Sequence, residues 1–243
     1  MISKIVLLLC MLSAAQPYKI CVSPDPECTR EEGHEAFKKK VNLEPYQNFQ
    51  NDPYRNQTDT SMAEINAVLA DKKRVCAIQY QDEQKITYVI RDFASKEEAE
   101  SQNFIVTHQG RCNVCSTLQD LSVYLGPSLM TMCKKCFTFA IFSEKSALKC
   151  LEKLGFTEPC AWISIYQYYN SKKYCLWPCL YDFLTNQPYN KPDGSLNNCL
   201  QCDEDHSGSV YKYFAGRYRR NSGIPSEIKR KDDELYQMTH CYF

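Results

Sequence analysis

The chain of 243 residues contains 15 cysteines, and this cysteine content constrains its fold more than any other feature of the sequence. Cys10 lies in an N-terminal apolar segment that we expect to be removed, and 15 less this one leaves an even set of 14. In an oxidising compartment an even set is typical of a disulfide framework. We therefore predict that every cysteine of the mature chain is oxidised, in a pairing that spacing alone does not give.

The N-terminus has the pattern of a secretory signal peptide. Lys4 precedes the apolar run 5–12, and Ser13-Ala14-Ala15 supplies the small residues that a signal peptidase recognises. We predict a signal peptide over residues 1–15 and a mature chain in the secretory lumen or outside the cell. No later run reaches the ~18 apolar residues that a membrane span needs. Asn56 opens the sequon Asn-Gln-Thr, which predicts N-glycosylation there.

The overall charge gives little information about partners. The chain has 29 basic and 29 acidic residues, so its formal net charge is zero. This balance argues against a nucleic-acid partner, which selects a basic surface. An extracellular protein or a glycan is the partner class that fits the predicted compartment.

The composition divides the chain into four parts. Behind the signal peptide, residues 16–60 are polar and turn-rich and predict a loop-rich arm with a short helix over 31–40. Residues 61–225 hold the regular apolar patterns and predict one disulfide-rich domain. Residues 226–243 are charged and predict a loosely held tail, with Cys241 tying its end back.

The first third of this domain predicts a small antiparallel sheet. Residues 75–80 and 86–90 are rich in aromatic and β-branched side chains around a polar turn, which is the pattern of a hairpin, and 104–107 adds a third strand. A capping-box pattern, Ser61 to Glu64, predicts a helix before the hairpin, up to Asp71, and the charged stretch 95–102 predicts a helical turn.

From Cys115 onward the apolar residues recur at helical spacing, and the cysteines fall on the apolar faces. We predict helices that are stapled to one another, and therefore an α+β fold whose second half is mainly helical. The expected helices cover 115–125, 128–142, 144–154, a segment starting at 157–159, and 210–218, with a turn-rich loop over 185–198.

The stretch His108 to Ser116, between the third strand and the first of these helices, contains the first candidate site. Cys112 and Cys115 lie at or just before a helix N-terminus, where a thiolate is most easily stabilised. This placement predicts, as an alternative to a structural role, a thiol-disulfide oxidoreductase that uses Cys112 and Cys115. Cys133-x-x-Cys136 completes a zinc-ribbon spacing, but an oxidising compartment favours disulfides over zinc.

The segment Gln109-Gly110-x-Cys112-x-x-Cys115 also resembles the corresponding stretch of papain-like proteases. The resemblance implies a thiol hydrolase with Cys115 as nucleophile, His206 as base, Asn221 as its orienting residue and Gln109 as oxyanion donor. The sequence departs from that family at Ser116, where an aromatic residue is expected, and at Gly223, where a tryptophan is expected. This hydrolase is the second alternative function.

A further pattern resembles the first half of a calcium loop. Asp203, Asp205 and Ser207 offer oxygen atoms at alternate positions, and Gly208 follows for the sharp turn. The twelfth position is Phe214 instead of glutamate, so a carboxylate from elsewhere would have to complete the site. Calcium is the one cofactor that the sequence suggests, as a weak ligand.

Three composite motifs resemble a group of secreted cysteine-rich proteins of microbial eukaryotes that has no known activity. The motifs are His108-x-Gly110-x-Cys112-x-x-Cys115-Ser116-x-x-Gln119-Asp120-Leu121, Cys199-x-x-Cys202-Asp203-Glu204-Asp205-x-Ser207-Gly208 and Gly216-Arg217-x-Arg219-Arg220-Asn221-Ser222-Gly223. The resemblance covers about residues 75–225 and implies one secreted domain. The leading interpretation is thus a secreted or lumenal, non-enzymatic binding or structural module.

Overall fold

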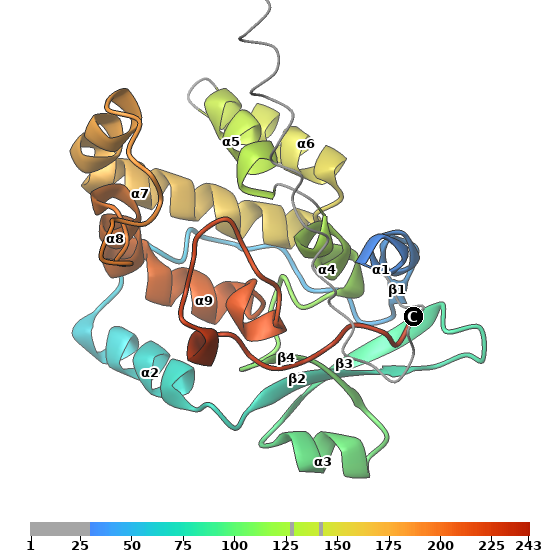
Figure 1. Ribbon diagram of the computed structural model, residues 1–243. Coiled ribbons are helices and arrows are strands. Elements are labelled where there is room, and N and C mark those ends of the chain that lie inside the picture. The colour runs from blue at the N-terminus through green and yellow to red at the C-terminus, as the bar shows by residue number, and fades with distance from the viewer. Residues whose placement is uncertain (1–29, 127–128, 141–142) are drawn as a thin grey trace, which may run out of the picture.

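The computed structural model describes residues 30–126, 129–140 and 143–243. The predicted signal peptide, Cys21 and Cys28 lie outside the described residues. The predicted fold class is confirmed, because a small sheet is followed by a mainly helical half (Figure 1). The elements are α1 (Arg30–Lys38), β1 (Val41–Asn42), α2 (Asp59–Ala70), β2 (Val75–Tyr80), β3 (Thr87–Phe93), α3 (Lys96–Ser101), β4 (Ile105–Gln109), α4 (Leu118–Leu125), α5 (Leu129–Ala140), α6 (Glu144–Leu154), α7 (Glu158–Leu184), α8 (Asn198–Asp203), η1 (Glu204–Gly208), α9 (Ser209–Ala215), η2 (Arg220–Ser222) and η3 (Asp232–Glu234).

The sheet has the strand order β1-β3-β2-β4. β2 pairs antiparallel with both β3 and β4, which confirms the predicted hairpin and third strand. The two-residue strand β1 pairs parallel with β3, so the sheet is mixed. The region predicted as an arm therefore contributes an edge strand to the sheet.

Side chains of β2 alternate between two hydrophobic clusters, as the twofold period of a strand requires. Cys76 and Ile78 face the large core that the helices share. Val75 and Ala77 face the opposite side, where α3 closes a smaller cluster. The sheet is thus buried on both faces, with α3 below it and the helical layer above it in Figure 1.

Local capping residues explain where several helices begin and end. Thr117 caps α4, and Ser143 caps α6, whose C-terminus ends at Gly155 with a φ of 109°. The predicted start of α2 at Ser61 is wrong. The N-cap is Thr58, and Ser61 is the third residue of the helix, where its hydroxyl completes the capping box.

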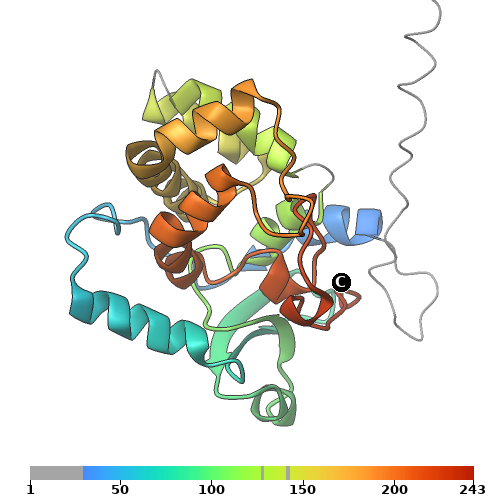
Figure 2. The same cartoon turned by 60° about the vertical axis from the view of Figure 1, so that its left-hand side comes forward.

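Helix α7 starts within the predicted segment 157–159 and continues through Pro178 to Leu184. Two disulfides, Cys175–Cys202 and Cys179–Cys199, join its C-terminal half to α8. Figures 1 and 2 both show this end of α7, in orange, at the edge of the molecule. None of the described helices is long and apolar enough to cross a bilayer.

The C-terminal tail is packed, and the prediction that it is loosely held is wrong. Phe37 of α1 is fully buried, and its ring lies 5.0 Å from that of Tyr242 and 5.3 Å from that of Phe243. Cys241 is disulfide-bonded. The tail therefore closes over α1 because its last aromatic residues find a hydrophobic partner there.

The described residues contain five disulfides: Cys76–Cys112, Cys115–Cys160, Cys136–Cys150, Cys175–Cys202 and Cys179–Cys199. Cys133 is a free thiol, so the prediction that every mature cysteine is oxidised is wrong at this position. Cys133 and Cys136 share one face of α5, but α6 offers a single cysteine, Cys150, to that face. Burial raises the pKa of the Cys133 thiol to about 12.

Candidate functional site

Residues of the His108–Leu121 and Gly216–Gly223 motifs converge on a buried polar cluster around Arg217. The Arg217 side chain is fully buried and donates hydrogen bonds to the carbonyl oxygens of Thr107 (2.9 Å), Cys115 (3.2 Å) and Ser116 (3.2 Å). It also donates to the Ser222 hydroxyl at 3.2 Å. Among the described residues this guanidinium forms no ion pair, so its hydrogen bonds go to neutral acceptors, while the charge of Asp120 stabilises it from a longer distance.

His108 joins this cluster in the neutral form. Its Nδ1 donates to the Gln109 carbonyl oxygen at 2.9 Å, and its Nε2 accepts from the Ser116 hydroxyl at 2.8 Å. Burial, together with the nearby charge of Arg217, holds the pKa of His108 well below its usual range. The Ser116–His108 pair resembles an activated nucleophile, but both side chains are completely buried. The pair fixes β4 to the entry of α4 and is closed to substrate.

Gly216 makes this packing possible. Its φ is 73°, and a Cβ atom at this position would lie 2.6 Å from the Asn113 nitrogen and 2.8 Å from the Ser116 Oγ. A side chain is therefore excluded both by backbone conformation and by space. Gly216 therefore allows the chain after α9 to approach the β4–α4 connection closely.

The two redox candidates are both disulfide-bonded, but not to each other. Cys112 is bonded to Cys76 of β2, and Cys115 is bonded to Cys160 of α7. Both cysteines are buried, Cys115 completely. The first bond joins the sheet to the connection before α4, and the second bond joins that connection to α7. It also leaves the zinc-ribbon set incomplete, because Cys136 is bonded to Cys150.

The hydrolase candidates are brought together only in part. The Asn221 side chain donates to the Gln109 carbonyl oxygen at 2.6 Å and to the Gly216 carbonyl oxygen at 2.8 Å. His206, in contrast, stacks on Tyr174 of α7, with ring centroids 4.9 Å apart. Since the sulfur of Cys115 is held in a disulfide, the arrangement contains no thiolate for His206 to activate.

The calcium candidates lie on a continuous helical segment, so the predicted loop is wrong. Asp203 ends α8, and Asp205 and Ser207 lie in the π-helical turn η1. Asp203 accepts hydrogen bonds from Gln167 and Ser171, and Ser207 hydrogen-bonds with Ser171 and Asn170. These oxygens fasten η1 to α7. Calcium binding stays a prediction, which calorimetry at millimolar calcium tests.

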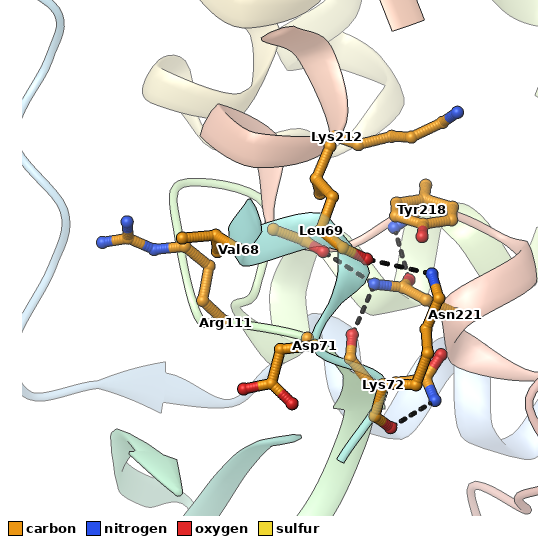
Figure 3. A pocket seen from close by; sticks show the side chains of 11 residues that line it. Val68, Leu69, Asp71, Lys72, Arg111, Lys212, Tyr218 and Asn221 are labelled. Carbon is orange, nitrogen blue, oxygen red and sulfur yellow. Dashed lines mark hydrogen bonds between the residues drawn. The ribbon is translucent and has the colours of Figure 1, made fainter. Parts of the chain in front are cut away.

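The described chain has a small pocket where α2, the β4–α4 connection and the segment after α9 meet (Figure 3). Figure 3 shows the Asn221 amide in the middle, hydrogen-bonded to its neighbours, while the charged ends of Lys212 and Arg111 point away from it. The cavity volume is about 20 Å³, which is the space of about one water molecule. This pocket is too small for a substrate.

A larger groove of about 670 Å³ runs between the edge strand β4 and the C-terminal segment. The groove is lined by apolar side chains such as Phe104 and Ile105 and by the charged side chains of Lys96 and Glu100. No group of three or more histidine, cysteine or acidic residues that could hold a metal occurs among the described residues.

The most unusual surface lies at the C-terminal end of α7, and the sequence reasoning missed it. We define the aromatic face as Tyr174, Leu176, Trp177, Leu180, Tyr181, Phe183 and Leu184, whose exposed fractions run from 40% to 80%. These seven are among only eleven large hydrophobic side chains that are strongly exposed in the described residues. A contiguous apolar surface of this kind marks an interaction site. Its signal in the sequence is the aromatic run itself, which forms one helical surface only because α7 continues across Pro178.

Comparison with known proteins adds one match. The model of a family of unknown function, DUF8771, matches residues 144–238, a range that contains all of α7 and Arg217. No curated protein and no solved structure matches the chain. The match agrees with a relationship to proteins without known activity, and the assignment to a microbial-eukaryote group stays a prediction.

Proposed function

We propose that the protein is a secreted or lumenal, disulfide-stabilised binding module without catalytic activity. The aromatic face of α7 carries this proposal, because seven exposed apolar side chains on one helix end are costly for a protein that binds nothing. The five disulfides and the N-terminal signal pattern support the oxidising compartment.

The burial and bonding of the candidate catalytic side chains support a non-enzymatic role. The groups that the motifs offered for catalysis, Cys112, Cys115, His108 and Ser116, are buried and bonded to structural partners. An oxidoreductase needs a sulfur that a partner can reach, and a hydrolase needs an accessible nucleophile. The purified protein should therefore not accelerate the reduction of insulin disulfides, and a rate like that of a thiol oxidoreductase would contradict the proposal.

Expression of the full chain in eukaryotic cells tests the compartment. The protein should be recovered from the medium with Gln16 as its first residue and with the five disulfides in a non-reducing peptide map. As a control, Leu8→Arg places a charge in the apolar run and should abolish export. Accumulation of reduced, uncleaved native chain in the cytosol would refute the proposed function.

A further inference from the structure

The residues of α7 between Tyr174 and Leu184 form three stripes along the helix. Tyr174, Trp177, Tyr181 and Leu184 follow at three- and four-residue spacing and form one exposed stripe, and Leu176, Leu180 and Phe183 form a second beside it. Cys175, Cys179 and Asp182 form the third stripe, which faces α8. The apolar surface therefore covers about half of the helix circumference.

The third stripe fixes the helix end, so the aromatic face is part of a rigid element. Both cysteines of the stripe are bonded to α8, and the buried Asp182 carboxylate accepts a hydrogen bond from the Cys199 nitrogen at 2.8 Å. The helix end cannot rotate to bury its apolar stripes against the body of the protein. Their exposure is built in, at the edge of the molecule that Figures 1 and 2 show.

The exposed charged side chains that α7 carries beside this face are lysines. From 159 to 192 the only acidic residue is Asp182, which is buried. Lys172 and Lys173 are exposed on the preceding turn of α7, and Lys191 is exposed in the loop that follows the helix. Two exposed carboxylates lie nearby, Asp193 in the same loop and Asp205 in η1, so the positive charge is concentrated on α7 itself.

We propose that the aromatic face inserts into the interface of an anionic lipid bilayer, with the three lysines contacting the headgroups. The inference rests on the proposed binding role and names its partner. Tryptophan and tyrosine favour the boundary between headgroups and acyl chains, and exposed lysines beside an apolar helical surface are attracted to anionic lipid. A helix end at the molecular edge can approach a flat bilayer surface, and an anionic bilayer accounts for both the aromatic side chains and the lysines.

The fluorescence of Trp177 reports insertion directly. The chain has two tryptophans, and Trp162→Phe leaves Trp177, which is 76% exposed, as the single emitter. The probe is vesicles of phosphatidylcholine alone and of phosphatidylcholine mixed with phosphatidylserine. We expect the Trp177 emission to shift to shorter wavelength on the mixed vesicles, and the protein, with its disulfides intact, to sediment with them.

A triple variant with a matched control identifies the surface. Trp177→Ala/Phe183→Ala/Leu184→Ala should weaken sedimentation with mixed vesicles roughly tenfold or more, since three apolar side chains no longer enter the bilayer. Ile86→Ala removes an apolar side chain that is 50% exposed at the sheet end and should leave binding unchanged. All changed positions are exposed, and unchanged urea midpoints verify that the variants fold.

The lysines are tested separately from the apolar stripes. Lys172→Glu/Lys173→Glu should weaken binding to the mixed vesicles roughly tenfold and should not weaken the binding to phosphatidylcholine alone. Added salt should reproduce the loss for the native chain.

Three results would overturn the membrane partner. Native protein that sediments with neither vesicle, or a triple variant that binds as well as the native chain, would each refute it. A shift of Trp177 emission with protein concentration, in the absence of vesicles and with dimers in gel filtration, would assign the face to a second copy instead. None of these results refutes the proposed secreted binding role, because that role is tested separately, by the compartment in which the native chain is found.

Discussion

His240 should make the protein sensitive to mild acid. The imidazole is buried, its Nε2 donates to the Ser222 carbonyl oxygen at 2.7 Å, and its Nδ1 accepts from the Tyr242 hydroxyl at 3.0 Å. Burial first, and the charge of Arg217 second, lower its pKa from 6.5 to about 3. Because the folded-state pKa lies below the unfolded one, this stabilisation is complete above pH 6.5 and is lost progressively as the pH falls towards 3.

The magnitude follows from the pKa difference. At pH 5 the unfolded chain has taken up the proton and the folded chain has not, so His240 alone should lower the free energy of unfolding by about 2 kcal/mol relative to pH 7. His240→Gln keeps an N–H donor for Ser222 and removes the titration. In urea unfolding followed by circular dichroism, this variant should lose about 2 kcal/mol less than the native chain between pH 7 and pH 5.

His206→Gln, at an exposed imidazole that stacks on Tyr174, is the control substitution of the same kind. Equal losses for the native chain and His240→Gln would refute the assignment of acid sensitivity to this imidazole.

Asp120 should act in the opposite direction. Burial raises the pKa of the Asp120 carboxyl from 3.8 to about 6, so the stability that it contributes is present below pH 4 and is lost as the pH rises through 6. In urea titrations, Asp120→Asn should therefore lose about 3 kcal/mol less than the native chain over this pH range. An unchanged pH profile would contradict the argument. The Cys133 thiol should resist alkylation in the native protein and be labelled after denaturation, as peptide mapping will show; rapid native labelling would contradict its burial. Asn56 is exposed in a turn and should carry a glycan, so enzymatic deglycosylation should lower the mass of the secreted native protein but not that of Asn56→Gln. This substitution keeps Thr58, the N-cap of α2. No mass shift in the secreted native protein would refute glycosylation at Asn56.

Elements with a strong local signal could be predicted from the sequence. The β2–β3 hairpin follows from side-chain alternation around a polar turn, and α6 follows from Ser143 and Gly155 at its two ends. The two-residue strand β1 carries no such signal, because its parallel pairing with β3 depends on contacts distant in sequence. The pairing of the cysteines and the packing of Tyr242 on Phe37 depend on the tertiary fold in the same way.

The candidate site shows why a motif predicts residues better than it predicts their role. His108, Ser116, Arg217 and Asn221 are the residue types of an active site, and the fold does bring them together. A guanidinium buried without a direct ion-pair partner needs several well-placed acceptors, and the chain supplies them as carbonyl oxygens just before α4 and in β4. Loss of one acceptor would leave a buried charge without one of its hydrogen bonds. A side chain in place of Gly216 would clash with the neighbouring chain. The same residue types would therefore be needed at these positions whether or not the protein bound any substrate, and the exposed end of α7, which no packing requirement explains, is the better guide to function.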